Sequence, residues 1–214
     1  MENRDYYKVL LVGASGKGKT YSFKDMDVNT TGFINVENKP LPFKNAFKFH
    51  KRINTYQEVL ETMVEYARNP EIKCIVIDSF SAYSDLVLQE MRKTKKGFDI
   101  WSGYNEEIAR FNEYVKKINK EMFVTAHYEI LALEGASEKR VKVAAKQWEG
   151  VFEKDYTMVL YAENKFNENN KPEYFYSLVG EGTSAKCPPD IFGPDVMKVQ
   201  NDCNYILESI LKFV

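Results

Sequence analysis

The chain has 214 residues, of which 44% are hydrophobic and 29% are charged, and this is the composition of an ordinary globular domain. It argues against intrinsic disorder, collagen and coiled coil for most of the chain. Thirty Lys and Arg residues oppose 31 Asp and Glu residues, and the net charge of −1 excludes a surface coated with positive charge for duplex DNA.

The spacing of the cysteines and the shortness of the apolar segments indicate where in the cell the protein is located. The three cysteines are far apart and form no CxxC pair, which indicates neither a disulfide framework nor a zinc site. The amino-terminal segment is charged, unlike a signal peptide, and no stretch approaches the ~20 apolar residues of a membrane span. We therefore expect a soluble cytoplasmic protein with no membrane partner.

Up to His127, short apolar runs alternate with segments of helical periodicity. The runs predict buried strands at residues 8–12, 32–36, 74–77 and 122–126. The periodic segments predict a short helix from near residue 19, a helix from a Thr55–Glu58 capping box to about residue 69, and helices at 82–91 and 104–119. The basic stretch 92–97 is predicted to be an exposed loop, and His50 a surface residue.

Beyond His127 the pattern changes. Residues 156–161 and 174–179 predict the two strands of a hairpin around an Asn-rich turn, and a last helix follows Asp202. We predict an α/β fold with a mostly parallel sheet flanked by helices on both faces and a C-terminal antiparallel hairpin extension. A single domain is expected over residues 1–214, with its core at about 6–130 and the extension at about 131–214.

Residues 13–20, GASGKGKT, fit the phosphate-binding pattern G-x-x-x-x-G-K-[ST] at every fixed position, between a predicted strand and a helix start. Glycines let backbone N–H groups curl around phosphate oxygens, and the helix N-terminus adds positive potential. Lys19 would reach the β- and γ-phosphates, and the Thr20 hydroxyl would ligate Mg²⁺. An ordinary Gly/Ser turn is the alternative. We assign nucleotide binding to Gly13, Ala14, Ser15, Gly16, Lys17, Gly18, Lys19, Thr20 and Tyr21.

Three polar residues end predicted strands, and parallel strands end at the same edge of a sheet as the phosphate-binding loop. Asp78 is predicted to be the second Mg²⁺ ligand, the Walker B carboxylate; a helix N-cap is the alternative. Because Ser79 stands where many ATPases have a glutamate, we expect Glu37 to polarise the attacking water; a solvated loop residue is the alternative. His127 is expected to contact the γ-phosphate and report its loss, unless it is a satisfied core histidine.

Together these motifs resemble the RecA-like recombination ATPases, most of all the short phage-encoded ones that assist single-strand annealing (a phage nucleotide-binding AAA or RecA-like family). The resemblance spans residues 9–129 and rests on GASGKGKT, the strand-end glutamate of INVENKPLP, IVIDSFSAY, the pair Trp101 and Tyr104, and FVTAHYE. It implies a RecA-like P-loop NTPase core, ATP and Mg²⁺, and Glu37 as the catalytic glutamate. It also implies a ring or filament on single-stranded DNA, a single-strand binding protein as partner, and the host cytoplasm.

The resemblance also places DNA contacts in two windows, residues 92–104 and 128–144. Their basic and aromatic side chains suit phosphate neutralisation and base stacking: Arg92, Lys93, Lys95, Lys96, Phe98 and Trp101 in the first, and Lys139, Arg140 and Lys142 in the second. A solvated loop with inward-facing aromatics is the alternative. Family members pass a cation into the neighbouring ATP site, which Lys186 matches; an exposed lysine is the alternative. The expected catalytic set is therefore Glu37, Lys19, His127 and Lys186.

The leading functional prediction is an ATPase that converts ATP to ADP and phosphate and is stimulated by single-stranded DNA. One alternative is a nucleotide-gated interaction module, such as a helicase-loading or packaging accessory, with little hydrolysis. A nucleotide kinase is less favoured, because the six arginines are scattered and form no Arg-rich lid.

Overall fold

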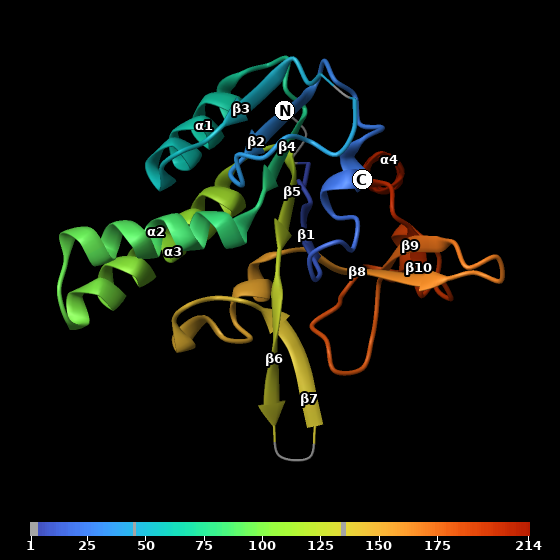
Figure 1. Cartoon of the computed structure of the whole chain (residues 1–214). Coiled ribbons are helices and arrows are strands. Elements are labelled where there is room, and N and C mark those ends of the chain that lie inside the picture. The colour runs from blue at the N-terminus through green and yellow to red at the C-terminus, as the bar shows by residue number, and fades with distance from the viewer. Residues whose placement is uncertain (1–3, 45, 134–135) are drawn as a thin grey trace.

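Helices and strands alternate around one large sheet in the computed structural model, which describes residues 4–44, 46–133 and 136–214 (Figure 1). Within these ranges, eight strands form the sheet in the order β10-β9-β8-β1-β5-β4-β2-β3. These strands are β1 Lys8–Val12, β2 Thr31–Asn35, β3 Phe49–Arg52, β4 Cys74–Asp78, β5 Glu121–Ala126, β8 Met158–Phe166, β9 Pro172–Ser177 and β10 Lys198–Gln200. A separate hairpin comprises β6 Tyr128–Leu133 and β7 Ala136–Val141. The α-helices are α1 Tyr56–Arg68, α2 Phe80–Thr94, α3 Phe98–Lys117 and α4 Cys203–Phe213.

The centre of the sheet is parallel, and one of its margins is antiparallel. β1 pairs in parallel with β5 and β8, β4 with β5 and β2, and β2 with β3. β9 and β10 add antiparallel strands beyond β8. The predicted α/β fold, with a mostly parallel sheet and a C-terminal antiparallel hairpin, is confirmed. Because parallel strands end together, the segments that follow β1, β2, β4 and β5 meet at one edge.

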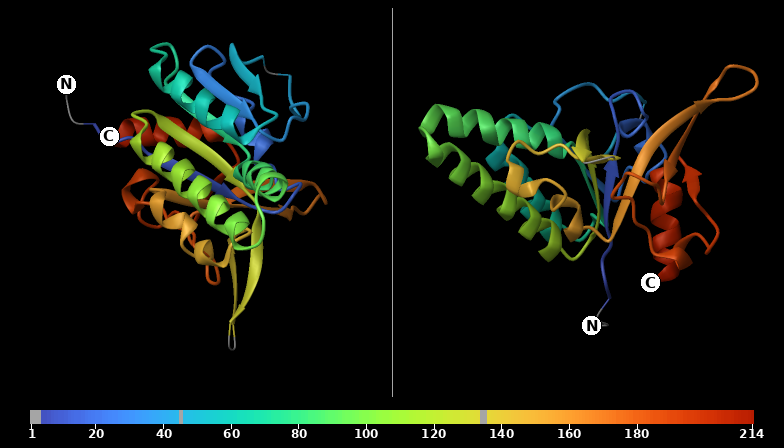
Figure 2. Two further views of the ribbon diagram at one scale, coloured as in Figure 1. Left: turned by 90° about the vertical axis from the view of Figure 1, so that its left-hand side faces the viewer. Right: turned by 90° about the horizontal axis from the view of Figure 1, so that it is seen from below.

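Both faces of the sheet are covered, which explains why the first strand is continuously apolar. Leu10 and Val12 of β1 pack with α1, α2 and α3, whereas Val9 and Leu11 pack with α4 and the turn around Phe23. All four of these β1 side chains are at most 1% exposed. Figure 2 shows α2 and α3 on one side of the sheet and α4 on the other. A strand buried on both sides carries apolar residues at every position instead of alternating.

Helix caps fix where two of the helices begin. The Thr55 hydroxyl accepts a hydrogen bond from the Glu58 amide, and the Glu58 carboxylate accepts one from the Thr55 amide, each at 3.3 Å. The predicted capping box is therefore confirmed. At α2 the capping oxygen is that of Ser79, which accepts from the amide of Ala82 at 3.2 Å. Asp78 therefore does not cap α2; it is the last residue of β4.

Several predicted elements differ from the structure. α2 continues to Thr94 and α3 begins at Phe98, so the predicted loop at 92–97 is reduced to residues 95–97, with Gly97 at φ 55°. An exposed last helical turn carries no apolar periodicity, and basic residues suit the negative end of the helix dipole. The predicted short helix near residue 19 is one 3-10 turn, Thr20–Phe23.

His50 was predicted to lie on the surface, and this is wrong. It belongs to β3, where the residue is half-buried and its ring meets the edge of Phe33 at 5.5 Å between centroids. The strand escapes sequence analysis because its sequence, FHKR, has no alternating apolar face. Window 128–144, predicted to be a loop, consists largely of the β6–β7 hairpin, and its residues 134 and 135 lie outside the described ranges.

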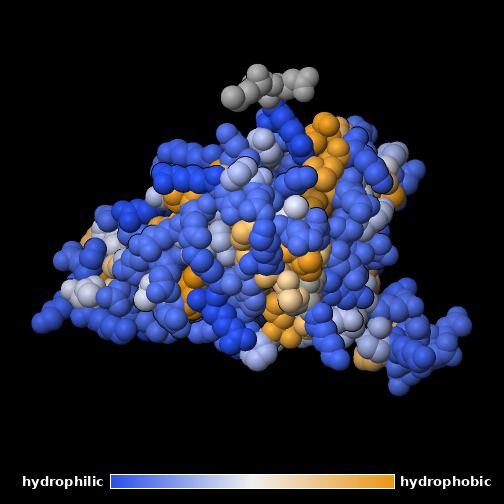
Figure 3. Space-filling view, turned by 90° about the horizontal axis from the view of Figure 1, so that it is seen from above, coloured by the Kyte–Doolittle hydropathy of each residue, from blue (hydrophilic) through white to orange (hydrophobic). Residues whose placement is uncertain are grey.

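Three hairpins project from the body of the molecule. In Figure 1, α2–α3 extends to the left, β6–β7 downward, and the end of β8–β9 to the right. Hydrophilic side chains cover most of the face seen in Figure 3, including the projecting end of α2–α3 at its left. Among the described residues, no helix is both long and apolar enough to cross a membrane.

Candidate active site

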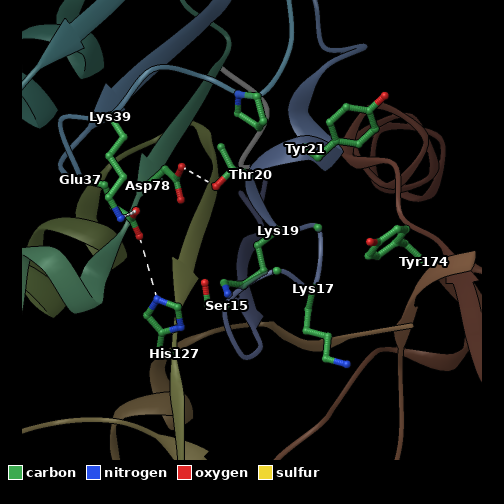
Figure 4. Close-up of a pocket in the computed structure, with 13 residues that line it drawn as sticks. Ser15, Lys17, Lys19, Thr20, Tyr21, Glu37, Lys39, Asp78, His127 and Tyr174 are labelled. Atoms are coloured by element: carbon green, nitrogen blue, oxygen red, sulfur yellow. Dashed lines mark hydrogen bonds and ion pairs between the residues drawn. The ribbon is translucent and has the colours of Figure 1, made fainter. Parts of the chain in front are cut away.

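A cavity of about 510 Å³ opens at the edge of the sheet where β1, β2, β4 and β5 end. It brings together groups from the loop after β1, from the loop after β2, from the end of β4 and from the residue after β5 (Figure 4). Its lining residues are Ser15, Gly16, Lys17, Gly18, Lys19, Thr20, Tyr21, Glu37, Lys39, Pro42, Asp78, His127 and Tyr174. Gly13 and Ala14, also assigned to nucleotide binding, lead from β1 into the loop.

The loop after β1 has the backbone of a phosphate cradle. Gly16 and Gly18 adopt φ of +76° and +84°, which side chains with a Cβ rarely tolerate. A Cβ at Gly16 would meet nothing within 4 Å, so this part of the loop faces open space. A Cβ at Gly18 would lie 3.0 Å from Oδ1 of Asn201 and 3.2 Å from Cδ1 of Tyr174. The backbone can therefore approach an anion closely from one side while the protein packs against the other.

Lys19 supplies a buried cation in this cradle. Its side chain is 8% exposed. Nζ donates hydrogen bonds to the carbonyl oxygens of Gly13, at 2.7 Å, and Ala14, at 2.9 Å. Burial lowers the pKa of Lys19 to about 8, and the carboxylates of Asp78 and Glu37 oppose that change. A desolvated cation beside open backbone N–H groups is well suited to a polyphosphate.

Thr20 and Asp78, which line the same cavity as Lys19, supply oxygen atoms suited to Mg²⁺. The Thr20 hydroxyl donates to Oδ2 of Asp78 at 2.9 Å, and the Thr125 hydroxyl donates to Oδ1 at 2.5 Å. Burial raises the pKa of Asp78, while these two hydroxyls act in the opposite direction. A hydroxyl and a carboxylate are the hard oxygen ligands that Mg²⁺ takes beside phosphate oxygens. The two predicted metal ligands thus fit the ion.

Glu37 follows β2 and enters the same cavity. Its carboxylate lies 3.4 Å from the Ser79 hydroxyl and 4.0 Å from Nε2 of His127, and Lys39 donates to it at 2.9 Å. Burial alone would raise the pKa of Glu37, but the hydrogen bond and charge of Lys39, with His127 and Ser79, lower it below its usual value. The carboxylate is therefore ionised at neutral pH.

His127 joins the cavity to the β6–β7 hairpin. Its Nδ1 lies 3.2 Å from the carbonyl oxygen of Gly13, and its backbone N–H donates to the Ser81 hydroxyl at 2.8 Å. Burial and the charge of Lys19 lower the pKa of His127, so its ring is neutral at pH 7. Its own carbonyl accepts from the Lys142 amide at 2.9 Å, which ties the end of β7 to this position.

The remaining predicted site residues lie elsewhere. Nζ of Lys186 donates to the carbonyl oxygen of Lys154 at 3.2 Å, and Lys186 does not line the cavity. Its action on a neighbouring ATP site remains a prediction. The first DNA window, residues 92–104, forms the end of α2–α3. The second, residues 128–144, contains the β6–β7 hairpin.

Sequence reasoning did not assign Thr125, Lys39 or Tyr174 to the site. Lys39 lies two residues after Glu37, and the strand-end motif FVTAHYE contains Thr125, so motif position alone could have suggested both. Tyr174 is distant from the phosphate-binding loop in the sequence. It reaches the cavity only because β9 pairs with β8, and no local pattern reveals that pairing.

Lys19 gives nucleotide affinity a pH dependence. Its ammonium loses the proton as pH rises through about 8, and phosphate binds the charged form. Affinity for Mg-ADP is therefore expected to fall about tenfold between pH 7 and pH 9. In a Lys19→Arg protein the guanidinium stays charged, so no such decline is expected. Calorimetric titration at both pH values checks this, and equal affinities in the wild-type protein would contradict it.

The fold and the site together are those of a P-loop NTPase domain. The chain belongs to an AAA domain family, whose model matches residues 5–187. Among the solved structures, 197 chains match. One is a KaiC-like protein from the hyperthermophilic archaeon Pyrococcus horikoshii OT3, with 13% identity and a TM-score of 0.46, covering 80% of this chain and 77% of that one. No curated protein matches.

Proposed function

We propose that this chain hydrolyses ATP to ADP and phosphate and that single-stranded DNA stimulates it, as in phage-encoded recombination or annealing ATPases. The position of Glu37 is the observation that supports ATP hydrolysis. Its carboxylate lines the same cavity as Lys19 and Asp78, at the side where His127 also lies. A carboxylate at this place can orient a water molecule toward the terminal phosphate and accept its proton.

Each group of the cavity has a distinct part in this reaction. Lys19 would hold the β- and γ-phosphates, and Thr20 and Asp78 would hold Mg²⁺. Bound Mg²⁺ neutralises phosphate charge. Glu37 would hold the attacking water. Because Nδ1 of His127 donates its proton to the Gly13 carbonyl, Nε2 can donate a hydrogen bond to a γ-phosphate oxygen once the phosphate charge draws a second proton onto the ring. Because His127 is tied to the amide of Lys142, loss of that phosphate can be passed to the β6–β7 hairpin.

The projecting end of α2–α3 supports a contact with single-stranded DNA. The Phe98 side chain is 82% exposed and that of Trp101 is 38% exposed, so aromatic faces are available for bases to stack on. Basic residues precede them in the same window. Those that are exposed can neutralise phosphates: Arg92, Lys93 and Lys96. Of these, Lys93 also lies 3.7 Å from the carboxylate of Glu90.

The β6–β7 hairpin offers fewer free cations. Lys139 lies 3.8 Å from the carboxylate of Glu163, and Arg140 pairs with Glu138 at 2.7 Å. Lys142 is exposed. We therefore propose the end of α2–α3 as the main DNA contact and Lys142 as an addition to it.

The test is the steady-state rate of phosphate release from Mg-ATP, with and without single-stranded DNA. We expect single-stranded DNA to accelerate release several-fold and duplex DNA to have a smaller effect. The Trp101→Ala, Phe98→Ala protein should lose the stimulation while keeping its basal rate, and a Phe166→Ala protein, altered at another exposed aromatic, should keep both. A rate that no nucleic acid changes would contradict the DNA part of the proposal.

A nucleotide-gated interaction module is the second candidate, and the Lys39–Glu37 ion pair favours it. That pair lowers the pKa of Glu37 and makes its carboxylate a weaker base. A helicase-loading or packaging accessory would bind ATP at this cavity and release phosphate no faster than a Lys19→Ala protein. A kinase has less support, because no arginine is among the cavity's lining residues.

A further inference from the structure

The cavity extends beyond the groups that hold phosphate and metal. Figure 4 shows Glu37 and His127 on one side of Lys19 and Thr20, and two tyrosines, Tyr21 and Tyr174, on the other. Both tyrosines line the cavity. Tyr21 is 45% exposed and Tyr174 is 39% exposed, so each presents ring surface to the open space.

Two contacts hold Tyr174 against the phosphate-binding loop. A Cβ at Gly18 would lie only 3.2 Å from Cδ1 of Tyr174, so the ring is packed on the loop backbone. Tyr174 is paired across the hairpin with Asn164, and the side chain of Asn164 accepts a hydrogen bond from Lys17. Both strands of the β8–β9 hairpin therefore contact the phosphate-binding loop, β8 through Asn164 and β9 through Tyr174, and these contacts position the Tyr174 ring.

The direction of the cavity identifies what this end can bind. If Glu37 orients the attacking water, the terminal phosphate of a nucleotide held by Lys19 lies toward Glu37, and its nucleoside lies at the opposite end of the cavity. That end offers aromatic faces, which attract the π-face of any base. Tyr21 is itself braced, because its ring meets the edge of Phe43 at 6.4 Å and Nζ of Lys24 lies 4.9 Å from its centroid.

We infer that Tyr174, with Tyr21, forms the nucleobase subsite, in which the base of the bound nucleotide stacks on the Tyr174 ring. This rests on the proposed function, since it needs a nucleotide at the phosphate-binding loop. It makes the β8–β9 hairpin part of the nucleotide site, and it makes Tyr174 a binding residue supplied by the C-terminal extension. Stacking is tolerant of base identity, so the subsite secures affinity more than choice of base.

Two probes separate the base from the phosphates: ADP and inorganic pyrophosphate, each titrated calorimetrically with Mg²⁺. Tyr174→Ala is expected to weaken ADP binding about tenfold and to leave pyrophosphate binding unchanged. Tyr174→Phe keeps the ring and should bind ADP as the wild-type protein does. Tyr205→Ala is the matched control, because Tyr205 is also 39% exposed but lies on α4 outside the cavity.

The other outcomes reject either the base subsite or the proposed function. If Tyr174→Ala leaves ADP affinity unchanged while Lys19→Ala weakens both probes, the base subsite is wrong and the phosphate site stands. Equal weakening of both probes by Tyr174→Ala would also overturn it, because the ring would then act only through the shape of the loop. If Lys19→Ala weakens neither probe, the proposed function fails and the subsite with it.

Discussion

Lys19→Ala is expected to reduce kcat/KM for ATP on the order of 10³-fold. The substitution removes a buried cation whose desolvated charge is available to phosphate oxygens, and the nearby Lys17 does not replace it, because its side chain is directed to Asn164. Phosphate release and calorimetric titration of Mg-ADP measure the loss of turnover and of affinity separately.

The control for Lys19→Ala is Lys117→Ala. Lys117 lies on α3, outside the cavity, and pairs with Glu113 at 3.6 Å on the surface. Its replacement removes the same unit of positive charge from the protein without altering the cavity, so turnover should stay within about twofold of the wild-type rate. If the two variants lost activity equally, general electrostatics would be responsible and Lys19 would have no special part.

Asp78→Asn is expected to lower turnover on the order of 10²-fold and to leave the fold at least as stable at pH 7. The amide keeps partners for the hydroxyls of Thr20 and Thr125, which contact Asp78 at 2.9 Å and 2.5 Å. It removes the negative charge that a divalent cation needs, so the concentration of Mg²⁺ required for half-maximal rate should rise.

Asp78→Asn is not expected to destabilise the fold at pH 7, because burial raises the pKa of Asp78 above its usual value. A carboxyl group with a raised pKa in the folded state stabilises the fold only at low pH, and this contribution disappears as pH rises through that pKa. At pH 7 the buried carboxylate therefore costs stability, and the neutral amide relieves that cost. Urea unfolding at pH 7 and at acidic pH measures it. A midpoint far below that of the wild-type protein at pH 7 would contradict the argument.

Contiguous motifs account for what the sequence predicts well. The strand before the phosphate-binding loop is apolar at every position because both its faces are buried, as Leu10 and Leu11 show on opposite sides. Asp78 ends β4 and Glu37 follows β2. Parallel strands end at the same edge of a sheet, so the edge on which these residues meet can be inferred without the structure.

Long-range contacts account for what the sequence does not predict. The bond from Thr125 to Asp78 depends on the register of β4 with β5, and the place of Tyr174 depends on the antiparallel register of β8 with β9. Neither register leaves a local signal. The end of α2 is missed because its exposed last turn carries charged residues and no apolar stripe. The start of α3 is missed because its first apolar residue, Phe98, is exposed and does not belong to the apolar stripe that begins at Tyr104.

The catalytic role of Glu37 is tested by measuring the turnover and the ATP affinity of Glu37→Gln beside those of the wild-type protein. The amide keeps the size of the side chain and can still meet Ser79, but it cannot accept a proton from water. We expect turnover to fall about 10²-fold while ATP affinity stays within about twofold. If the variant released phosphate at the wild-type rate, Glu37 would not be the catalytic carboxylate. If, in addition, both rates were no higher than that of Lys19→Ala, the site would be a nucleotide-gated module and not the ATPase proposed above.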